Sequence, residues 1–564
     1  MIKKKLRHNL TGGQAVVKVL EKEKVNYVFG LIGSATMEIF DSLYKNAKIK
    51  FIGVRDERTG THMADGYARA SGKAGIVLAG QNGPGSTNLV TGVAQAYKAF
   101  SPVISLAGDV STKHYGKDTF QEINQQSLFE PITKKTFTIK KTSEIKKILS
   151  NSFKIATTPR MGPVHVNLPR DILSNTFNFS NFSTHKKNNV PKAKISEILS
   201  VIKIINNSNK PAIIAGGGIK NSNSEKNLIK FSKFLNIPIV SAAGHGDVIP
   251  FNEKLYGGQM GPRGNSLAKK LLKEADVILA FGTRLGFNST FFSYEYLSKK
   301  ASIIQIDIEN SSLGRYYPIK IGICADVKNF IDELYKEYNS LKKIPNFDKW
   351  SKKFIIQRKE FLANRDNLAD LKENPIHPSG LFKILSNNLP KNSAITLDAG
   401  TLCLQATDIF KHYKSLSLFT PLDFGLVGFS FACGLGVKLA NPKRTVISLI
   451  GDGGFGMTVS ELSTAVKYNI NTIIIVLNNK SWGAEKAYQR DFFNKRYIGA
   501  DISSPRFDKL AKLYGAEGIY VEKLSSFKTA IKKALKKKKP TIINVQIDPN
   551  ALYSFRKDSF QNKK

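Results

Sequence analysis

Cysteine and acidic residues are both scarce in this 564-residue chain. The three cysteines, Cys324, Cys403 and Cys433, lie far apart and form neither a disulfide framework nor a metal-ligand spacing. No run of about 20 apolar residues is present, and the basic start MIKKKLRHNL lacks the apolar stretch of a secretory signal. We therefore expect a cytoplasmic protein that does not enter a membrane.

The shortage of acidic residues leaves a formal net charge of +41, which raises the question of nucleic-acid binding. The lysines are spread along the whole chain, among many Ile and Asn residues, as a biased genome composition would produce. The densest run, KKALKKKK (532–539), ends a predicted amphipathic helix and has no interleaved aromatic residues. We expect no nucleic-acid partner, but we expect the charge to attract small anionic ligands.

Short β-branched runs alternate with helical stretches throughout the chain, which predicts an α/β fold with three doubly wound parallel-sheet domains. The proposed domains cover residues 1–175, 195–340 and 375–564. A polar stretch at 176–194 reads as a linker, and a charged helical connection is expected at about 340–374. The predicted strands are 50–54, 75–79, 102–107 and 163–168, then 211–215, 237–242, 276–281 and 302–308, then 394–398, 445–450, 472–477 and 541–547.

Ligands of open parallel sheets bind beyond the carboxyl ends of the strands, so the residues that follow each run are informative. Asp452 follows one predicted strand of the third domain and Asn479 follows the next. If these strands are neighbours, a carboxylate and an amide oxygen face one crevice and suit Mg²⁺. Gly451, Gly453 and Gly454 would let the backbone approach a phosphate, with the N-terminus of a helix near 460–468 facing it. The alternative is a glycine-rich turn followed by an asparagine turn.

The sequence GDG, then 24 residues, then NN, each after a predicted strand, resembles the binding motif of thiamine diphosphate enzymes. That resemblance implies thiamine diphosphate and Mg²⁺ as cofactors, with Asp452, Asn479 and the main-chain oxygen of Ser481 as metal ligands. It also implies that the three domains are, in order, pyrimidine-binding, central and diphosphate-binding.

This chemistry needs a carboxyl group that exchanges protons with the aminopyrimidine ring, and such a group works best when it is desolvated. In the stretch RDERTGTHMADGYARASG (55–72), Glu57 falls where the catalytic Glu of this superfamily falls. The alternative is a charged surface turn, because Asp56 and Glu57 lie between two arginines.

Further loops of the first domain match the family. Gly83, Pro84 and Gly85 make a sharp loop, and Thr87 and Asn88 are expected to cap the next helix. The family places this loop against the cofactor ring. By the same resemblance, Gly33 lies near the reacting atoms, Gln121 lines the active site, and Val427 supports the bent cofactor; an ordinary core valine is the alternative for Val427.

In this superfamily the cofactor bridges the first domain of one subunit and the third domain of another, so the resemblance implies a homodimer or homotetramer. Acetolactate synthase is one comparison within the superfamily. Stretches such as GLIGSATMEIFD (30–41), FGTRLG (281–286) and WGAEKAYQRDFFNKRYIGA (482–500) resemble sulfoacetaldehyde acetyltransferase more. That family converts sulfoacetaldehyde and phosphate into acetyl phosphate and sulfite. The alternative is an acetolactate synthase-type carboligase acting on pyruvate or another 2-oxo acid.

Both donor and acceptor of the acetyltransferase reaction are anions, which bind to cationic or amide groups. Asp56 and Arg58 replace the residues usual beside the catalytic Glu, and the loop 108–119 matches neither family closely, so the substrate stays open. The candidate substrate residues, each of which could instead be a surface or packing residue, are Arg58, His114, Lys117, Trp482, Lys486 and Arg556.

The middle domain contains a triple glycine at 216–218 and an acidic residue, Asp307, after a predicted strand. This pair suggests a dinucleotide site, but the glycines do not form the GxGxxG pattern. The synthases bind FAD in this domain, whereas the acetyltransferases resemble it without needing the flavin. We therefore expect no FAD.

Overall fold

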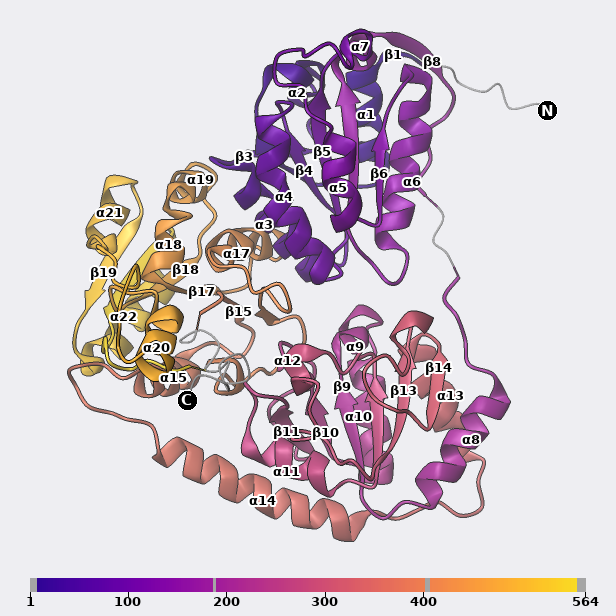
Figure 1. Cartoon of the computed structure of the whole chain (residues 1–564), viewed down its shortest axis with the longest axis vertical. Coiled ribbons are helices and arrows are strands. Elements are labelled where there is room, and N and C mark those ends of the chain that lie inside the picture. Colours follow the sequence, from indigo (N-terminus) through magenta and orange to yellow (C-terminus); the bar gives the residue numbers. More distant parts are fainter. Residues whose placement is uncertain (1–7, 186–188, 401–405, 555–564) are drawn as a thin grey trace.

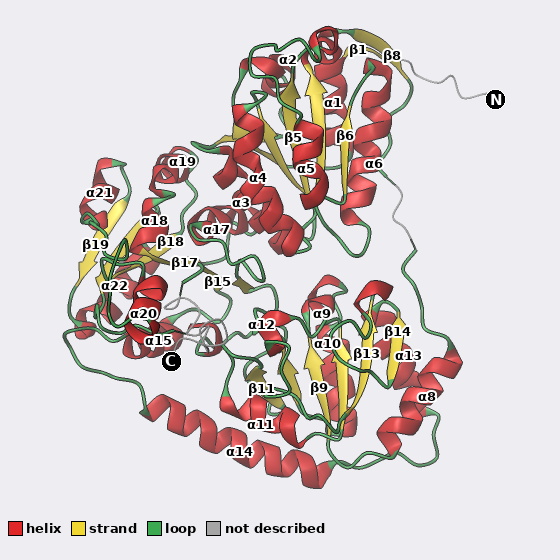
Figure 2. Cartoon of the chain, in the orientation of Figure 1, coloured by secondary structure: helices red, strands yellow, loops and turns green. Residues whose placement is uncertain are grey.

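The computed structural model describes residues 8–185, 189–400 and 406–554, which form three α/β domains (Figure 1). Each domain contains one six-stranded sheet in which every pair of neighbouring strands is parallel. Helices cover both faces of each sheet (Figure 2). The predicted fold class is therefore confirmed.

The first sheet has the strand order β3-β2-β4-β5-β7-β6. Successive residues of a strand face opposite sides of the sheet, so Ile76 and Leu78 of one strand join one core while Val77 joins the other. The strands are β2 (Tyr27–Leu31), β3 (Lys50–Gly53), β4 (Gly75–Ala79), β5 (Val103–Asp109), β6 (Lys135–Thr138) and β7 (Val164–Pro169). The helices are α1 (Gly12–Lys22), α2 (Met37–Tyr44), α3 (Glu57–Ser71), α4 (Pro84–Lys98), α5 (Gln125–Phe129), α6 (Ile145–Thr157) and α7 (Arg170–Ser174).

The polar stretch at 176–194 is not a linker from its start, which corrects the sequence-based interpretation. Its first four residues form β8 (Thr176–Phe179), which pairs antiparallel with β1 (His8–Thr11). The only buried side chain of β8 is Phe179, which packs into the core under α1 and α6. This small second sheet attaches the end of the first domain to its beginning.

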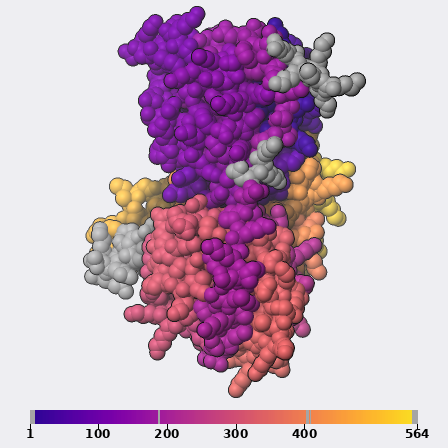
Figure 3. All heavy atoms as spheres, turned by 90° about the vertical axis from the view of Figure 1, so that its right-hand side faces the viewer, coloured from indigo at the N-terminus to yellow at the C-terminus, as the bar shows by residue number. Residues whose placement is uncertain are grey.

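The middle sheet has the order β11-β10-β9-β12-β13-β14. In Figure 3 the first domain is stacked on the middle domain, and α8 lies across the outer surface of the latter. The strands are β9 (Pro211–Ala215), β10 (Ile239–Ser241), β11 (Tyr256–Gln259), β12 (Val277–Phe281), β13 (Ser302–Asp307) and β14 (Ile321–Cys324). The helices are α8 (Ile195–Asn206), α9 (Gly217–Asn221), α10 (Glu225–Leu235), α11 (Ser266–Glu274), α12 (Phe287–Thr290) and α13 (Val327–Asn339).

The expected charged connection is the long helix α14 (Asp348–Asn367), which runs from the middle domain to the third (Figure 1). The third sheet has the order β16-β15-β17-β18-β20-β19. The strands are β15 (Ala394–Leu397), β16 (Leu418–Phe419), β17 (Val446–Gly451), β18 (Ile473–Asn478), β19 (Glu517–Val521) and β20 (Thr541–Gln546). The helices are α15 (Pro378–Asn388), α17 (Phe429–Ala440), α18 (Asp452–Gly456), α19 (Leu462–Lys467), α20 (Gly483–Phe492), α21 (Phe507–Leu513) and α22 (Leu524–Lys536).

The first and third domains share one hydrophobic core, in which α3 packs against α17. The approach is close, because a Cβ atom added at Gly66 would lie 2.3 Å from the Cys433 carbonyl oxygen, and one at Gly436 would lie 1.9 Å from that of Met63. Glu461 adds a polar link, since its Oε1 accepts hydrogen bonds from the Arg55 amide and the Thr59 hydroxyl. No helix among the described residues is both long and apolar enough to span a bilayer.

Candidate active site

Glu57 is the first residue of α3, and its side chain is buried, with a relative exposure of 3%. The Asp56 side chain accepts a hydrogen bond from the Arg58 amide at 2.7 Å and so caps the helix that carries Glu57. Asn88 donates its Nδ2–H to Glu57 Oε2 at 3.1 Å. Burial raises the pKa of Glu57, and the Asn88 hydrogen bond offsets part of that rise. The carboxyl group is therefore held where it can gain and lose a proton nearer to neutral pH than usual.

The glycine-proline loop lies against this carboxyl group. A Cβ atom added at Gly85 would lie 3.2 Å from Glu57 Oε1, so a side chain there would crowd the carboxyl. Helix α4 begins at Pro84 without a side-chain cap, which corrects the prediction that Thr87 and Asn88 cap it. Proline is favoured at the first turn because it has no N–H to satisfy. Asn88 thus lies one turn inside the helix, where it reaches Glu57.

Gly33 and Gln121 join the same cluster. A Cβ atom at Gly33 would lie 2.4 Å from the Gly80 carbonyl carbon, so these two backbones are in close contact. Gln81, the next residue, donates its side-chain N–H to Gln121 Oε1. Gly83, with a φ of +53°, lies against the Gln121 carbonyl oxygen. The structure therefore brings together every first-domain residue that the sequence nominated for cofactor or catalysis.

The third domain presents a second cluster at the carboxyl ends of β17 and β18, which are paired neighbours. Asp452 begins the short helix α18 directly after β17, so the helix expected near 460–468 is not the first one after the glycines. Ser504, which sequence reasoning missed, donates its hydroxyl to Asp452 Oδ2 at 2.6 Å. Burial raises the pKa of Asp452, and the Ser504 hydrogen bond offsets part of that rise.

The donors in this second cluster fit a hard divalent cation. Asp452 and Asn479 are 2% and 5% exposed, and the buried Ser481 hydroxyl has no hydrogen-bond partner. Carboxylate, amide and main-chain oxygens are ligands that Mg²⁺ accepts, and it takes its remaining ligands from phosphate and water. Among the described residues no three His, Cys, Asp or Glu side chains are gathered for a metal.

The glycines beside Asp452 have distinct surroundings. A Cβ atom at Gly451 would meet nothing within 4 Å, so its backbone faces open space that a diphosphate could occupy. A Cβ atom at Gly453 would lie 2.7 Å from the Trp482 ring, and one at Gly454 would lie 3.3 Å from Val427. Trp482 and the half-buried Val427 are thus packed against this loop.

Asp398, at the end of β15, is a buried acid that the sequence reading passed over as part of a strand. A Cβ atom at Gly454 would lie 2.4 Å from Asp398 Oδ2, which places this carboxyl beside the glycine loop. It accepts hydrogen bonds from the amides of Gly428, Phe429 and Ser430 at the start of α17. Complete burial nonetheless raises its pKa to about 7. The sequence did contain a signal that could have identified Asp398, because it is an acidic residue at the carboxyl end of another predicted strand of the third domain.

The described candidate substrate residues lie on different elements of the first and third domains. Arg58 donates to the Met457 carbonyl, just after α18, and so adds a polar link between the first and third domains of one chain. His114 and Lys117 are exposed on the loop between β5 and α5. Lys486, on α20, forms an ion pair with Asp501. Arg556 lies outside the described residues.

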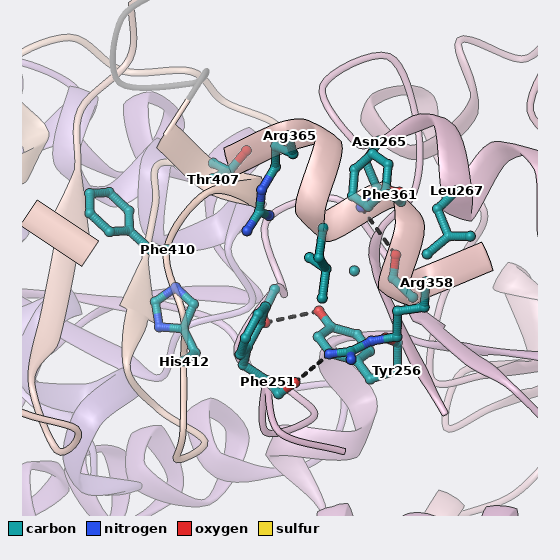
Figure 4. Close-up of a pocket in the computed structure, with 14 residues that line it drawn as sticks. Phe251, Tyr256, Asn265, Leu267, Arg358, Phe361, Arg365, Thr407, Phe410 and His412 are labelled. Carbon is teal, nitrogen blue, oxygen red and sulfur yellow. Dashed lines mark hydrogen bonds between the residues drawn. The ribbon is translucent and has the colours of Figure 1, made fainter. Parts of the chain in front are cut away.

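Two cavities lie apart from the contacts described so far. One, of about 30 Å³, lies between the middle domain, α14 and the third domain, where Arg358 donates to the carbonyls of Phe251 and Tyr256 (Figure 4). The other is a cleft of about 790 Å³ lined by all three domains. In the cleft, Arg160 donates to Asp307 at 2.8 Å.

Comparison with known proteins supports the resemblance to thiamine diphosphate enzymes that the sequence motif indicated. Residues 10–128 match the N-terminal thiamine pyrophosphate-binding domain of the thiamine pyrophosphate enzymes, residues 198–334 their central domain, and residues 398–545 their C-terminal thiamine pyrophosphate-binding domain.

Full-length relatives carry two kinds of name. A probable acetolactate synthase large subunit of Methanocaldococcus jannaschii is 34% identical, with 96% of this chain and 92% of the relative aligned. A sulfoacetaldehyde acetyltransferase of Castellaniella defragrans is 31% identical, with 98% and 95% aligned. An acetolactate synthase large subunit of Buchnera aphidicola is 33% identical, with 96% and 95% aligned. With all three domains matched in order, the chain belongs to the thiamine pyrophosphate enzyme family.

Proposed function

We propose that this chain is a thiamine diphosphate- and Mg²⁺-dependent enzyme that converts sulfoacetaldehyde and phosphate into acetyl phosphate and sulfite. The carbon–sulfur bond breaks, sulfite leaves with the bonding electrons, and the two-carbon unit is transferred to a phosphate oxygen. The observation that carries the reaction type is the buried Glu57 carboxyl, held by Asn88 and fitted against Gly85.

The residues of the two clusters have separate tasks in this proposal. When bound, thiamine diphosphate would supply a carbon that becomes nucleophilic once it loses a proton, and a ring that stabilises the negative charge that develops after this carbon attacks a carbonyl group. Glu57 holds and releases the proton that this chemistry needs, and desolvation tunes its pKa for that role. Asp452, Asn479 and the Ser481 carbonyl would hold Mg²⁺, and the backbone at Gly451 would face the diphosphate.

Support for sulfoacetaldehyde as the donor comes from the sequence. The stretches at 30–41, 281–286 and 482–500 favour sulfoacetaldehyde acetyltransferase, and the relative from Castellaniella defragrans carries that name. Exposed His114 and Lys117, on the loop that leads to Gln121, suit an anionic donor of either kind. The second candidate is a carboligase acting on pyruvate or another 2-oxo acid, which the relative from Methanocaldococcus jannaschii favours at comparable identity.

The proposal includes no FAD. Gly216, the first residue of the triple glycine, serves backbone packing, because a Cβ atom there would lie 2.2 Å from the Gly282 carbonyl oxygen, whereas Gly217 and Gly218 line the cleft of about 790 Å³. A Cβ atom at Gly217 would lie 2.8 Å from the His245 ring. Asp307, the acid that a ribose would contact, is already bound to Arg160. A purified protein with flavin absorbance near 450 nm would contradict this part.

The proposal also includes a homodimer or homotetramer with the active site between subunits. Apolar side chains are exposed in the first and third domains, and exposed apolar patches are typical of surfaces that bind another protein. Phe120 is 80% exposed in the first domain, and Ile498 is 83% exposed in the third. The others are Ile32, Met37, Tyr115, Ile123, Phe424, Met457 and Tyr497.

The first test is sulfite release from sulfoacetaldehyde with thiamine diphosphate, Mg²⁺ and phosphate, comparing wild type with Glu57→Gln. We expect phosphate-dependent release that falls by at least roughly a hundredfold in the variant, the usual contribution of a proton-transferring group. Asn88→Ala should weaken activity less, because it removes only the hydrogen bond to Glu57. Pyruvate consumption without sulfite release would favour the carboligase.

A further inference from the structure

The loop between β5 and α5 begins and ends at the predicted active site. At its start, a Cβ atom at Gly108 would lie 2.6 Å from Ala35 and 3.3 Å from the Gly80 carbonyl oxygen. At its end, Gln121 is bound by Gln81, and its carbonyl accepts a hydrogen bond from Asn82 at 3.1 Å. The intervening residues 110–120 therefore cross the carboxyl edge of the sheet, over the loops assigned to the cofactor.

A buried carboxylate holds the middle of this loop. Asp109, the last residue of β5, is 5% exposed, and its Oδ2 accepts the Tyr115 hydroxyl at 2.8 Å. Its Oδ1 accepts the amide of Val110 at 2.8 Å. Burial, with a smaller contribution from Glu122, raises the pKa of Asp109 to about 6, so it is ionised at neutral pH. The same burial and the adjacent Asp109 raise the pKa of Tyr115, so its hydroxyl keeps the proton that it donates.

Other contacts give the loop its internal shape. Glu122 accepts the amides of Gly116 and Thr119, and Asp171 accepts the amide and hydroxyl of Thr112. Between these contacts, His114 and Lys117 are exposed and are brought together by the bond from the Lys117 amide to the His114 carbonyl. Two basic side chains therefore lie on a short, folded segment on either side of Tyr115.

We propose that Asp109 and Tyr115 are positioning residues, whose hydrogen bond fixes the loop 110–120 so that His114 and Lys117 bind the anionic group of the donor substrate. This inference rests on the proposed function, and it adds the residues that set donor affinity. Gln121 has separate contacts with Gln81 and Asn82. We therefore expect loss of the Asp109–Tyr115 bond to loosen the segment that carries His114 and Lys117 more than it loosens Gln121.

The kinetic test compares Tyr115→Phe with Tyr44→Phe, a matched loss of one hydroxyl from a ring that is 91% exposed on α2. We expect Tyr115→Phe to raise KM for the donor roughly tenfold while kcat stays within about twofold, because the variant loosens the basic residues that bind the donor and leaves Glu57 in place. Lys117→Ala should raise KM in the same way, and Tyr44→Phe should match wild type. Equal KM values for Tyr115→Phe and wild type would overturn the proposal, as would a fall in kcat alone.

The wild-type protein is first assayed with sulfoacetaldehyde and with pyruvate, and the substrate that it consumes is the donor in this test. Either one is suitable, because both are anions. If wild type consumes neither, the proposed function fails before any variant is compared. The claim that the Asp109–Tyr115 hydrogen bond holds the loop is tested without substrate by trypsin, which cleaves after Lys113 and Lys117. Faster cleavage at these sites in Tyr115→Phe than in Tyr44→Phe supports the anchor, because proteolysis reports local opening. Equal cleavage rates overturn it.

Discussion

Asp398 is a fully buried carboxyl group whose protonation is coupled to folding. It accepts three amide hydrogen bonds from the start of α17, yet desolvation dominates and raises its pKa to about 7 from 3.8. Between these two pH values the folded chain binds a proton that the unfolded chain has lost. Stability from this group is therefore complete below about pH 4 and is lost as the pH rises to 7.

We expect Asp398→Asn to become more stable relative to wild type as the pH rises from 5 to 8. The full pKa difference corresponds to roughly 4 kcal/mol, and the part lost above pH 5 to about 3 kcal/mol. The measurement is the urea midpoint of both proteins at the two pH values, without cofactor. Asp41→Asn, at an exposed side chain of α2, is the control and should differ from wild type equally at both. A difference for Asp398→Asn that does not change with pH would show that the group does not titrate in this range.

At the scale of elements, the contact between α3 and α17 depends on glycine. Gly436→Ala would place a Cβ atom 1.9 Å from the Met63 carbonyl oxygen, so the two helices must separate. We expect a loss of stability of about 1–3 kcal/mol, the usual cost of overpacking, and a lower thermal midpoint by calorimetry.

Gly456→Ala is the matched control, because it also lies in a helix but has nothing within 4 Å of the added Cβ atom. Alanine favours a helix over glycine by up to about 1 kcal/mol, so this variant should be as stable as wild type or more so. Equal thermal midpoints for the two variants would mean that the close helix contact does not matter for stability.

The burial of each element explains why some elements could be predicted from the sequence and others could not. Central strands such as β17 and β18 are buried on both faces, so they appear in the sequence as continuous apolar runs. Strand β8 has one buried side chain in four, and its partner β1 lies at the other end of the domain, so no local pattern marks it. Asp452 and Asn479 could be found because each follows a central strand. The contacts of Ser504 with Asp452 and of Asn88 with Glu57 depend on tertiary structure alone.

At the scale of the whole molecule, the two clusters belong to different domains. Glu57 makes its side-chain contacts with Asn88 and Gly85 in the first domain, and Asp452 is bound by Ser504 in the third. The proposed dimer places the first cluster of one subunit opposite the second cluster of its partner. A site built in this way needs one intact copy of each cluster, and the two copies need not come from the same chain.

Mixed subunits test that arrangement directly. Glu57→Gln and Asp452→Asn should each be inactive alone, because one lacks the proposed proton carrier and the other a proposed metal ligand. In a dimer of one subunit of each kind, one shared site carries both changes and the other carries neither. Random assortment makes half of the dimers mixed, so co-refolded or co-expressed variants should recover about a quarter of wild-type activity. Sites formed within single chains would recover none, since every chain would carry one defect. The control is each variant co-expressed with Glu57→Gln/Asp452→Asn, a pairing that leaves no intact site in either arrangement.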